Sequence, residues 1–164
     1  MAYLLDSDAL IEAKKRWYGL DFCPAYWDWL VRENAAGRVY SIEKVADEIE
    51  AGGDELSAWV AARGPAFFLK PDAAVLPALR TVSDWATSGQ HEAAAVNTFL
   101  QAADYYLVAQ ALAHGHRVVT HEIPATLRKK IKIPDACIGV GVKCMSPFEM
   151  LRVSRARFVL PALP

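Results

Sequence analysis

The sequence predicts an α/β protein, with a central, mostly parallel sheet between two layers of helices. Short apolar runs, each long enough for one buried strand, alternate with longer segments whose apolar residues recur at helical spacing. Turn residues, chiefly glycine and proline, separate these segments. Such alternation is typical of strand–helix–strand units, which bury parallel strands between helices on both faces. We therefore expect one three-layer α/β/α domain over residues 1–164.

The first half of the chain begins with a strand that ends in an acid. Residues Tyr3 to Leu5 form a buried apolar run, Asp6 follows at its carboxyl end, and Ser7 is expected to cap the next helix. The same reasoning predicts helices over residues 9–18, 25–34, 42–50 and 54–63, and short strands at 39–40 and 66–69.

The second half repeats this alternation. Helical spacing predicts helices over residues 72–88 and 91–114, the second with a bend near 101–103, and a final helix from Ser146 through Leu151. Residues 117–120 are a compact β-branched strand, and residues 129–134 are basic and extended. Residues 137–145 are expected to form a loop that leads into a last strand near 142–145.

The composition is that of an ordinary globular domain. Of the 164 residues, 54% are apolar and 23% are charged, and the formal net charge is −1. So small a net charge excludes a strong overall field, and contact with nucleic acid would need a local basic patch. No apolar run reaches membrane-spanning length, and the first strand has no basic region before it, so we expect a cytoplasmic protein.

The cysteines argue against two kinds of cross-link. Cys23, Cys137 and Cys144 are odd in number and widely spaced. This pattern predicts no disulfide framework and suits a reducing compartment. Because cysteines and histidines are not clustered, the pattern does not predict a zinc site either.

Four acids are placed to meet at one edge of the predicted sheet. Asp6 and Glu122 each follow a strand, and parallel strands bring their carboxyl ends to the same edge, where α/β proteins bind ligands. Glu48 lies beside the apolar stripe of its helix, and Asp104 continues the apolar stripe of a later helix. Other interpretations remain open: a helical acid is usually solvated, Asp104 could cap a helix, and Glu122 could be a turn residue.

Acids gathered in one crevice call for a counter-charge. Four neighbouring carboxylates cannot all stay ionised without one. Mg²⁺ or Mn²⁺ prefers carboxylate oxygens, and either ion can activate water and offset the charge of a scissile phosphate. The pattern therefore predicts a divalent metal site that acts on phosphate esters.

The ordered motifs resemble those of the PIN-domain family of metal-dependent ribonucleases. The matching segments are residues 4–8, 45–49, 104–111 and 118–122, which together extend over most of the chain. The resemblance implies a metal site built from Asp6, Glu48, Asp104 and Glu122, with Thr120 assisting through a hydrogen bond. It also implies single-stranded RNA as substrate and, because bacterial members are often toxins, a cognate antitoxin protein as a partner.

Two positions depart from the usual motifs of that family. Asp8 stands where asparagine is more common, and Glu122 stands where aspartate is common. Whether Asp8 and the neighbouring His121 take part in the site is left open. Exposed apolar segments at 158–160 and 27–29 could serve a homodimer or an antitoxin peptide, although the core is the simpler location for both.

Basic and aromatic residues supply candidate contacts for a polyanion. Lysine and arginine cluster at residues 14–16, 128–132 and 152–157, where they are either solvated surface or a rim that binds phosphates. Trp17, Tyr18 and Trp27 could stack on unpaired bases or lie in the core.

Two other functions compete with the ribonuclease. A phosphatase of the haloacid-dehalogenase type also begins with a strand followed by Asp-x-Asp, and Asp6 would then be a nucleophile. The usual continuation of that motif is absent, because Ala9 follows the acidic pair. Alternatively, the chain is a catalytically inactive PIN-like binding module whose acids hold no metal.

Overall fold

The computed structural model describes residues 1–164 and confirms the α/β fold. Five parallel strands form one sheet in the order β3-β2-β1-β4-β5. The strands are β1 (Tyr3–Leu5), β2 (Val39–Ile42), β3 (Phe68–Leu69), β4 (Arg117–Val119) and β5 (Cys144–Met145). β1 is central, and its Leu4 lies opposite Tyr40 of β2 on one side and Val118 of β4 on the other.

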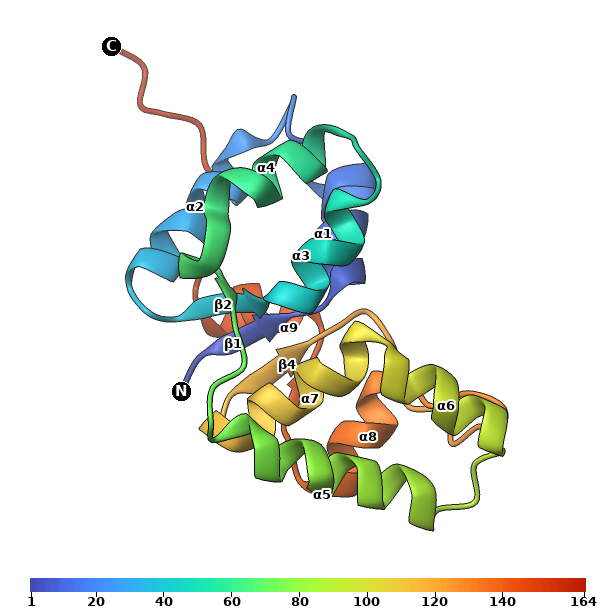
Figure 1. The fold of residues 1–164 in the computed structure, drawn as a ribbon. Helices are drawn as coiled ribbons and strands as arrows, with labels where there is room; N and C mark the ends of the chain where they lie inside the picture. Colours follow the sequence, from blue (N-terminus) through green and yellow to red (C-terminus); the bar gives the residue numbers. More distant parts are fainter.

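Nine α-helices surround this sheet. They are α1 (Ser7–Glu12), α2 (Pro24–Ala35), α3 (Glu43–Glu50), α4 (Glu55–Arg63), α5 (Val75–Ser88), α6 (Ala93–Gln101), α7 (Ala103–His114), α8 (Ile133–Val140) and α9 (Pro147–Val153). In Figure 1, α1–α4 gather into one group and α5–α8 into another, with the strands between them. A π-helical turn, η1 (Ala13–Trp17), extends α1, and a 3-10 turn, η2 (Gly64–Ala66), follows α4. No helix is long and apolar enough to cross a membrane.

A single hydrophobic core holds the strands in place. It contains 38 buried residues, among them Leu4 and Leu5 of β1 and Val118 and Val119 of β4, all without exposed surface. Burying a side chain of this size contributes about 1.5–3 kcal/mol. Because both faces of β1 and β4 are covered, the positions of their carboxyl ends are fixed by packing.

The strand order creates a crevice between β1 and β4. The chain proceeds from β1 outward through β2 to β3 on one side, and then crosses to the other side of β1 to form β4 and β5. The strand order therefore reverses between β1 and β4, and in open α/β sheets ligands bind at such a switch point. Asp6 follows β1 at this point and Thr120 follows β4.

Several local predictions are confirmed and two are wrong. The long helical region is broken at Ala102, which has extended backbone between α6 and α7, as the predicted bend requires. The cap of α1 is Asp6 rather than Ser7, because the Asp6 carboxylate accepts the Ala9 N–H. The segment expected to be a loop from residue 137 is mostly helix α8, which begins at Ile133 with a proline in its first turn.

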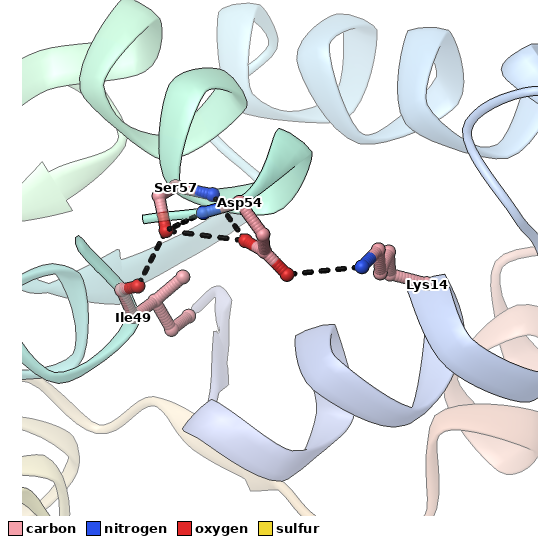
Figure 2. Close-up of polar contacts among 4 residues, drawn as sticks. All are labelled: Lys14, Ile49, Asp54 and Ser57. Carbon is pink, nitrogen blue, oxygen red and sulfur yellow. Dashed lines mark hydrogen bonds and ion pairs between the residues drawn. The ribbon is translucent and has the colours of Figure 1, made fainter. Parts of the chain in front are cut away.

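A capping box fixes the start of α4 and joins it to the end of the first helix. Figure 2 shows the Ser57 N–H donating to Asp54 and the Asp54 N–H donating to the Ser57 hydroxyl, at 3.0 and 3.2 Å. The Ser57 hydroxyl also reaches the Ile49 carbonyl at the end of α3. The second oxygen of Asp54 pairs with Lys14 Nζ at 2.9 Å. The hydrogen bond from Lys14 is the main cause that lowers the pKa of Asp54 to about 2.

Variants of Asp54 should separate its two roles. We expect Asp54→Ala to lower the free energy of unfolding by about 1 kcal/mol, because it removes a helix cap. Asp54→Asn keeps the cap and loses only a solvent-exposed ion pair, so it should cost no more than a few tenths of a kcal/mol. Urea unfolding of both variants, with Lys14→Met as the matched control for the ion pair, measures the difference. Equal losses for the two Asp54 variants would show that the ion pair, not the cap, stabilises this corner.

Candidate functional site

Asp6 lies at the centre of the candidate site. It is 3% exposed and its main-chain N–H donates to the Val119 carbonyl at 3.1 Å, continuing the pairing of β1 with β4. Its Oδ1 accepts the Ala9 N–H at 2.6 Å, and its Oδ2 accepts the Thr120 hydroxyl. The acid therefore has a structural role as a helix cap in addition to any chemical one.

Thr120 connects Asp6 to Glu122. Its side chain is 1% exposed, and its N–H donates to the Met145 carbonyl of β5 at 3.0 Å. Its hydroxyl oxygen accepts the Glu122 N–H at 3.1 Å while donating to Asp6. Thr120 therefore contacts Asp6 directly, and its role in assisting a metal site stays a prediction.

Glu122 and Glu48 each accept a main-chain N–H at the start of a helix. The half-buried Glu122 accepts the N–H of Ile133, the first residue of α8, at 2.9 Å. Glu48 is exposed on α3, where it accepts the Ser7 hydroxyl at 2.6 Å and the N–H of Ala103, the first residue of α7, at 3.4 Å. Carboxylates at helix N-termini are favoured by the helix dipole and by the free N–H groups there.

Asp104 lies in the first turn of α7, among the other acids. It is not the cap of that helix, because Ala102 occupies the cap position. Burial raises the pKa of Asp104 to about 6, and the nearby charges of Glu122, Glu48 and Asp8 act in the same direction. The charge of Lys130 opposes them. Four predicted site residues thus reach the same neighbourhood from four different elements, and Asp8 joins them.

The pKa of Asp6 is also raised, to about 7. Burial is the main cause, and the charges of Asp8 and Asp104 add to it. The hydrogen bonds from Thr120 and from the Ala9 N–H oppose the shift, because they stabilise the carboxylate. A buried acid whose pKa lies near neutrality, in a crevice with other acids, is the kind of group that functional sites contain.

The carboxylates are suitable ligands for a hard divalent cation, but they do not surround a position on all sides. All the converging groups are carboxylates, which are ligands for Mg²⁺ and Mn²⁺. However, no group of three or more His, Cys, Asp or Glu side chains has the spacing to hold a metal ion. Mg²⁺ often binds through one or two carboxylates and keeps several waters. A cation at these residues would therefore bind through one or two carboxylates and keep most of its waters.

Two pockets adjoin the acids. One of about 190 Å³ is lined by Asp104 together with Lys129 and Lys130. The loop that carries Arg128, Lys129 and Lys130 is held beside α6, because the Glu92 N–H donates to the Arg128 carbonyl at 2.9 Å. The other pocket, of about 300 Å³, is lined by Thr120 and Glu122 and by more apolar residues.

The aromatic candidates differ in their availability. Trp27 is 2% exposed and its indole N–H donates to the Tyr18 carbonyl at 2.7 Å, so it belongs to the core. Tyr18 stacks on buried Tyr26 with ring centroids 4.3 Å apart. Trp17 is 48% exposed and packs edge-on against Phe148. It is the one of the three that has a surface free for a base.

Sequence reasoning missed two contributors to the site. Ser7 was expected to cap a helix, but its hydroxyl holds the Glu48 carboxylate. Lys130 was placed only in a basic cluster, whereas its charge acts directly on Asp104. Lys130 lies in a loop 26 positions after Asp104, and no sequence pattern links a loop residue to a helical residue at that distance. Only the tertiary structure reveals that the two are neighbours.

The raised pKa of Asp6 predicts a particular pH dependence of stability. Below about pH 4, the ordinary pKa of an unfolded aspartate, Asp6 is protonated in both states and its contribution is fully present. As the pH rises through about 7, the unfolded state releases this proton first and the contribution is lost. Asp6→Asn removes this loss, so the variant should melt at the same temperature as the parent near pH 4 and on the order of a few degrees higher at pH 8.

Melting curves in EDTA at several pH values measure this difference. Asp47→Asn, an exposed acid on the same helix as Glu48, is the control and should show no such divergence. A constant difference between Asp6→Asn and the parent from pH 4 to pH 8 would contradict the raised pKa.

Comparison with known proteins identifies the family but not an activity. No curated protein and no solved structure matches the chain. No PIN-domain family model matches either, so the resemblance to those ribonucleases remains a prediction. One family model, described as a domain of unknown function (DUF4411), matches residues 3–158. The chain therefore belongs to the DUF4411 family.

Proposed function

We propose that this protein is a Mg²⁺- or Mn²⁺-dependent endoribonuclease that hydrolyses phosphodiester bonds of single-stranded RNA. The observation that carries the proposal is the meeting of Asp6 and Asp104 with further acids at the switch point of a parallel sheet. Burying these two acids as carboxylates costs free energy. A cation bound between them would offset this cost by its attraction to their negative charges. The resemblance of the motifs to PIN-domain ribonucleases supports the choice of reaction.

The roles of the residues follow from their contacts. Asp6 and Asp104 would hold the cation directly, and Glu48 and Glu122 would bind its waters. Thr120 and the Ala9 N–H fix the orientation of the Asp6 carboxylate. A metal held there would supply a water of lowered pKa and would offset negative charge on the scissile phosphate.

The surroundings of the acids support a polyanionic substrate. Lys129 and Lys130 line the pocket that contains Asp104, where they can bind a phosphate of the strand. Exposed Trp17 offers a face on which an unpaired base can stack. The choice of RNA, the role as a bacterial toxin and the cognate antitoxin come from the family resemblance. A homodimer would use the exposed apolar side chains of Val159 and Leu160, because Trp27 and Trp29 are buried.

One observation favours a second candidate function, a binding module without catalysis. Glu48 and Glu122 both accept main-chain N–H groups at helix starts, which gives each of them a purely structural role. In that case no cation binds, and the acids only shape a docking surface. Calorimetric titration with Mn²⁺ distinguishes the nuclease from the binding module. A metal site releases or absorbs heat when Mn²⁺ binds, whereas a module that holds no metal gives no heat.

A haloacid-dehalogenase-type phosphatase receives less support. The Asp-x-Asp pair at Asp6 and Asp8 is followed by Ala9, so the chain lacks the usual continuation of the phosphatase motif. Trapping of a covalent aspartyl-phosphate with a small phosphomonoester would favour this alternative.

Removing either central acid should abolish cleavage. We expect Asp6→Asn and Asp104→Asn each to lower the rate of Mn²⁺-dependent cleavage of a single-stranded RNA by roughly 10²–10³-fold or more, because each removes charge that stabilises the transition state. Cleavage of a labelled oligoribonucleotide measures the rate, and Mn²⁺ should raise the melting temperature of the parent but not of Asp104→Asn. The control Asp47→Asn should retain full activity. Parent-like cleavage by Asp6→Asn would refute the assigned site.

Lys130 should contribute to binding rather than to chemistry. Lys130→Ala is expected to weaken binding of single-stranded RNA and to reduce the slope of log affinity against log salt by about 0.7, the value for one lost phosphate contact. Fluorescence anisotropy in EDTA measures binding without cleavage. Lys143→Ala is the matched control, because Lys143 lies at the opposite end of the strands beside Gly115 and Arg117. The same loss in both variants would indicate only a general charge effect.

A further inference from the structure

Two of the three cysteines come together in the fold although the sequence gives no sign of a pair. Cys137 lies in α8 and Cys144 lies in the edge strand β5, seven positions later. α8 packs against β5, and the neighbouring thiol is the main cause of the pKa shift of each cysteine, which places the two side chains next to each other. The turn between them is tight: Gly141 ends α8 with left-handed backbone, and the Val142 N–H donates to the Cys137 carbonyl at 2.8 Å.

The two thiols differ in their access to solvent. Cys137 has no exposed surface and belongs to the hydrophobic core. Cys144 is partly exposed and lines the pocket of about 300 Å³ beside Glu122. A small reagent can therefore reach Cys144 from the pocket, while Cys137 can react only with its neighbour.

The two neighbouring thiols also differ in acidity. The Cys137 thiol lowers the pKa of the Cys144 thiol, and Cys144 together with burial raises the pKa of Cys137. The charges of Asp6, Glu122 and Glu149 oppose the lowering at Cys144. A thiol with lowered pKa and solvent access is the nucleophilic member of a pair, and its buried neighbour is the resolving member.

We propose that Cys137 and Cys144 are a redox-active dithiol that hydrogen peroxide converts into an internal disulfide. The Cys144 thiolate attacks a peroxide oxygen, the O–O bond breaks, and the departing hydroxide takes a proton to become water. The sulfenic acid on Cys144 is then attacked by the sulfur of Cys137. The S–S bond forms, the S–O bond breaks, and the hydroxide leaves as water with the proton of Cys137. Two thiols lose two electrons in total, and the peroxide is reduced to two waters.

The neighbouring contacts place this bond close to the acidic site. Cys144 precedes Met145, whose carbonyl accepts the Thr120 N–H at 3.0 Å. Glu122 and Cys144 line the same pocket. The disulfide would thus join α8, whose first N–H is held by Glu122, to the strand that supports Thr120. The dithiol does not depend on the ribonuclease assignment, and its test requires no RNA.

The test is a thiol count and a peptide map on the full chain. The reduced protein is treated with hydrogen peroxide, unfolded, and alkylated. We expect the number of alkylated thiols to fall from three to one, with Cys23 as the remaining thiol. Trypsin should release one cross-linked species, in which Ile133–Lys143 is joined to Cys144–Arg152, and dithiothreitol should separate its two peptides.

Three variants make the result specific. Cys23→Ser should leave the cross-link intact. Cys144→Ser should prevent it and leave the buried Cys137 thiol free. Cys137→Ala should stop the reaction at the sulfenic acid, which dimedone labels on Cys144, and an unchanged circular dichroism spectrum confirms that each variant folds. Three free thiols after oxidation, or a cross-link that involves Cys23, would overturn the proposal.

Discussion

The candidate site depends on one interaction between distant parts of the chain, the hydrogen bond from the Thr120 hydroxyl to the Asp6 carboxylate. The two residues are 114 positions apart, and each follows one of the two neighbouring strands in the middle of the sheet. Burying a carboxylate costs free energy unless it is well bonded, and here the Ala9 N–H supplies the second bond. Strand pairing, the start of the first helix and the geometry of the crevice therefore converge on one side chain.

The other acids share this double character. Glu48 and Glu122 accept the first N–H groups of α7 and α8, and Asp104 lies within the first turn of α7. Helix N-termini point at the same crevice from several directions, and their N–H groups partly offset the acids that collect there. The acids thus bind the N-termini of the helices around the crevice. Burial in the crevice raises the pKa of two of these acids, Asp6 and Asp104, toward neutral pH.

The two pockets beside the crevice differ in charge and polarity. A pocket with two lysines adjoins Asp104, and a more apolar pocket with Cys144 adjoins Glu122. A bound strand would meet positive charge on one side and a partly apolar wall with a reactive thiol on the other. This asymmetry ties the two proposals to one region of the molecule, although each rests on its own contacts.

The sequence alone determined the fold class and the parallel strands, and it named the acids that meet at the candidate site, because periodicity and strand-end acids are local patterns. It also predicted the bend before α7. It could not decide that Asp6 rather than Ser7 caps α1, that Lys130 faces Asp104, or that Cys137 and Cys144 meet. These facts depend on which helix starts and loop residues pack together across the sheet, and such packing is set by the burial of side chains far apart in the chain.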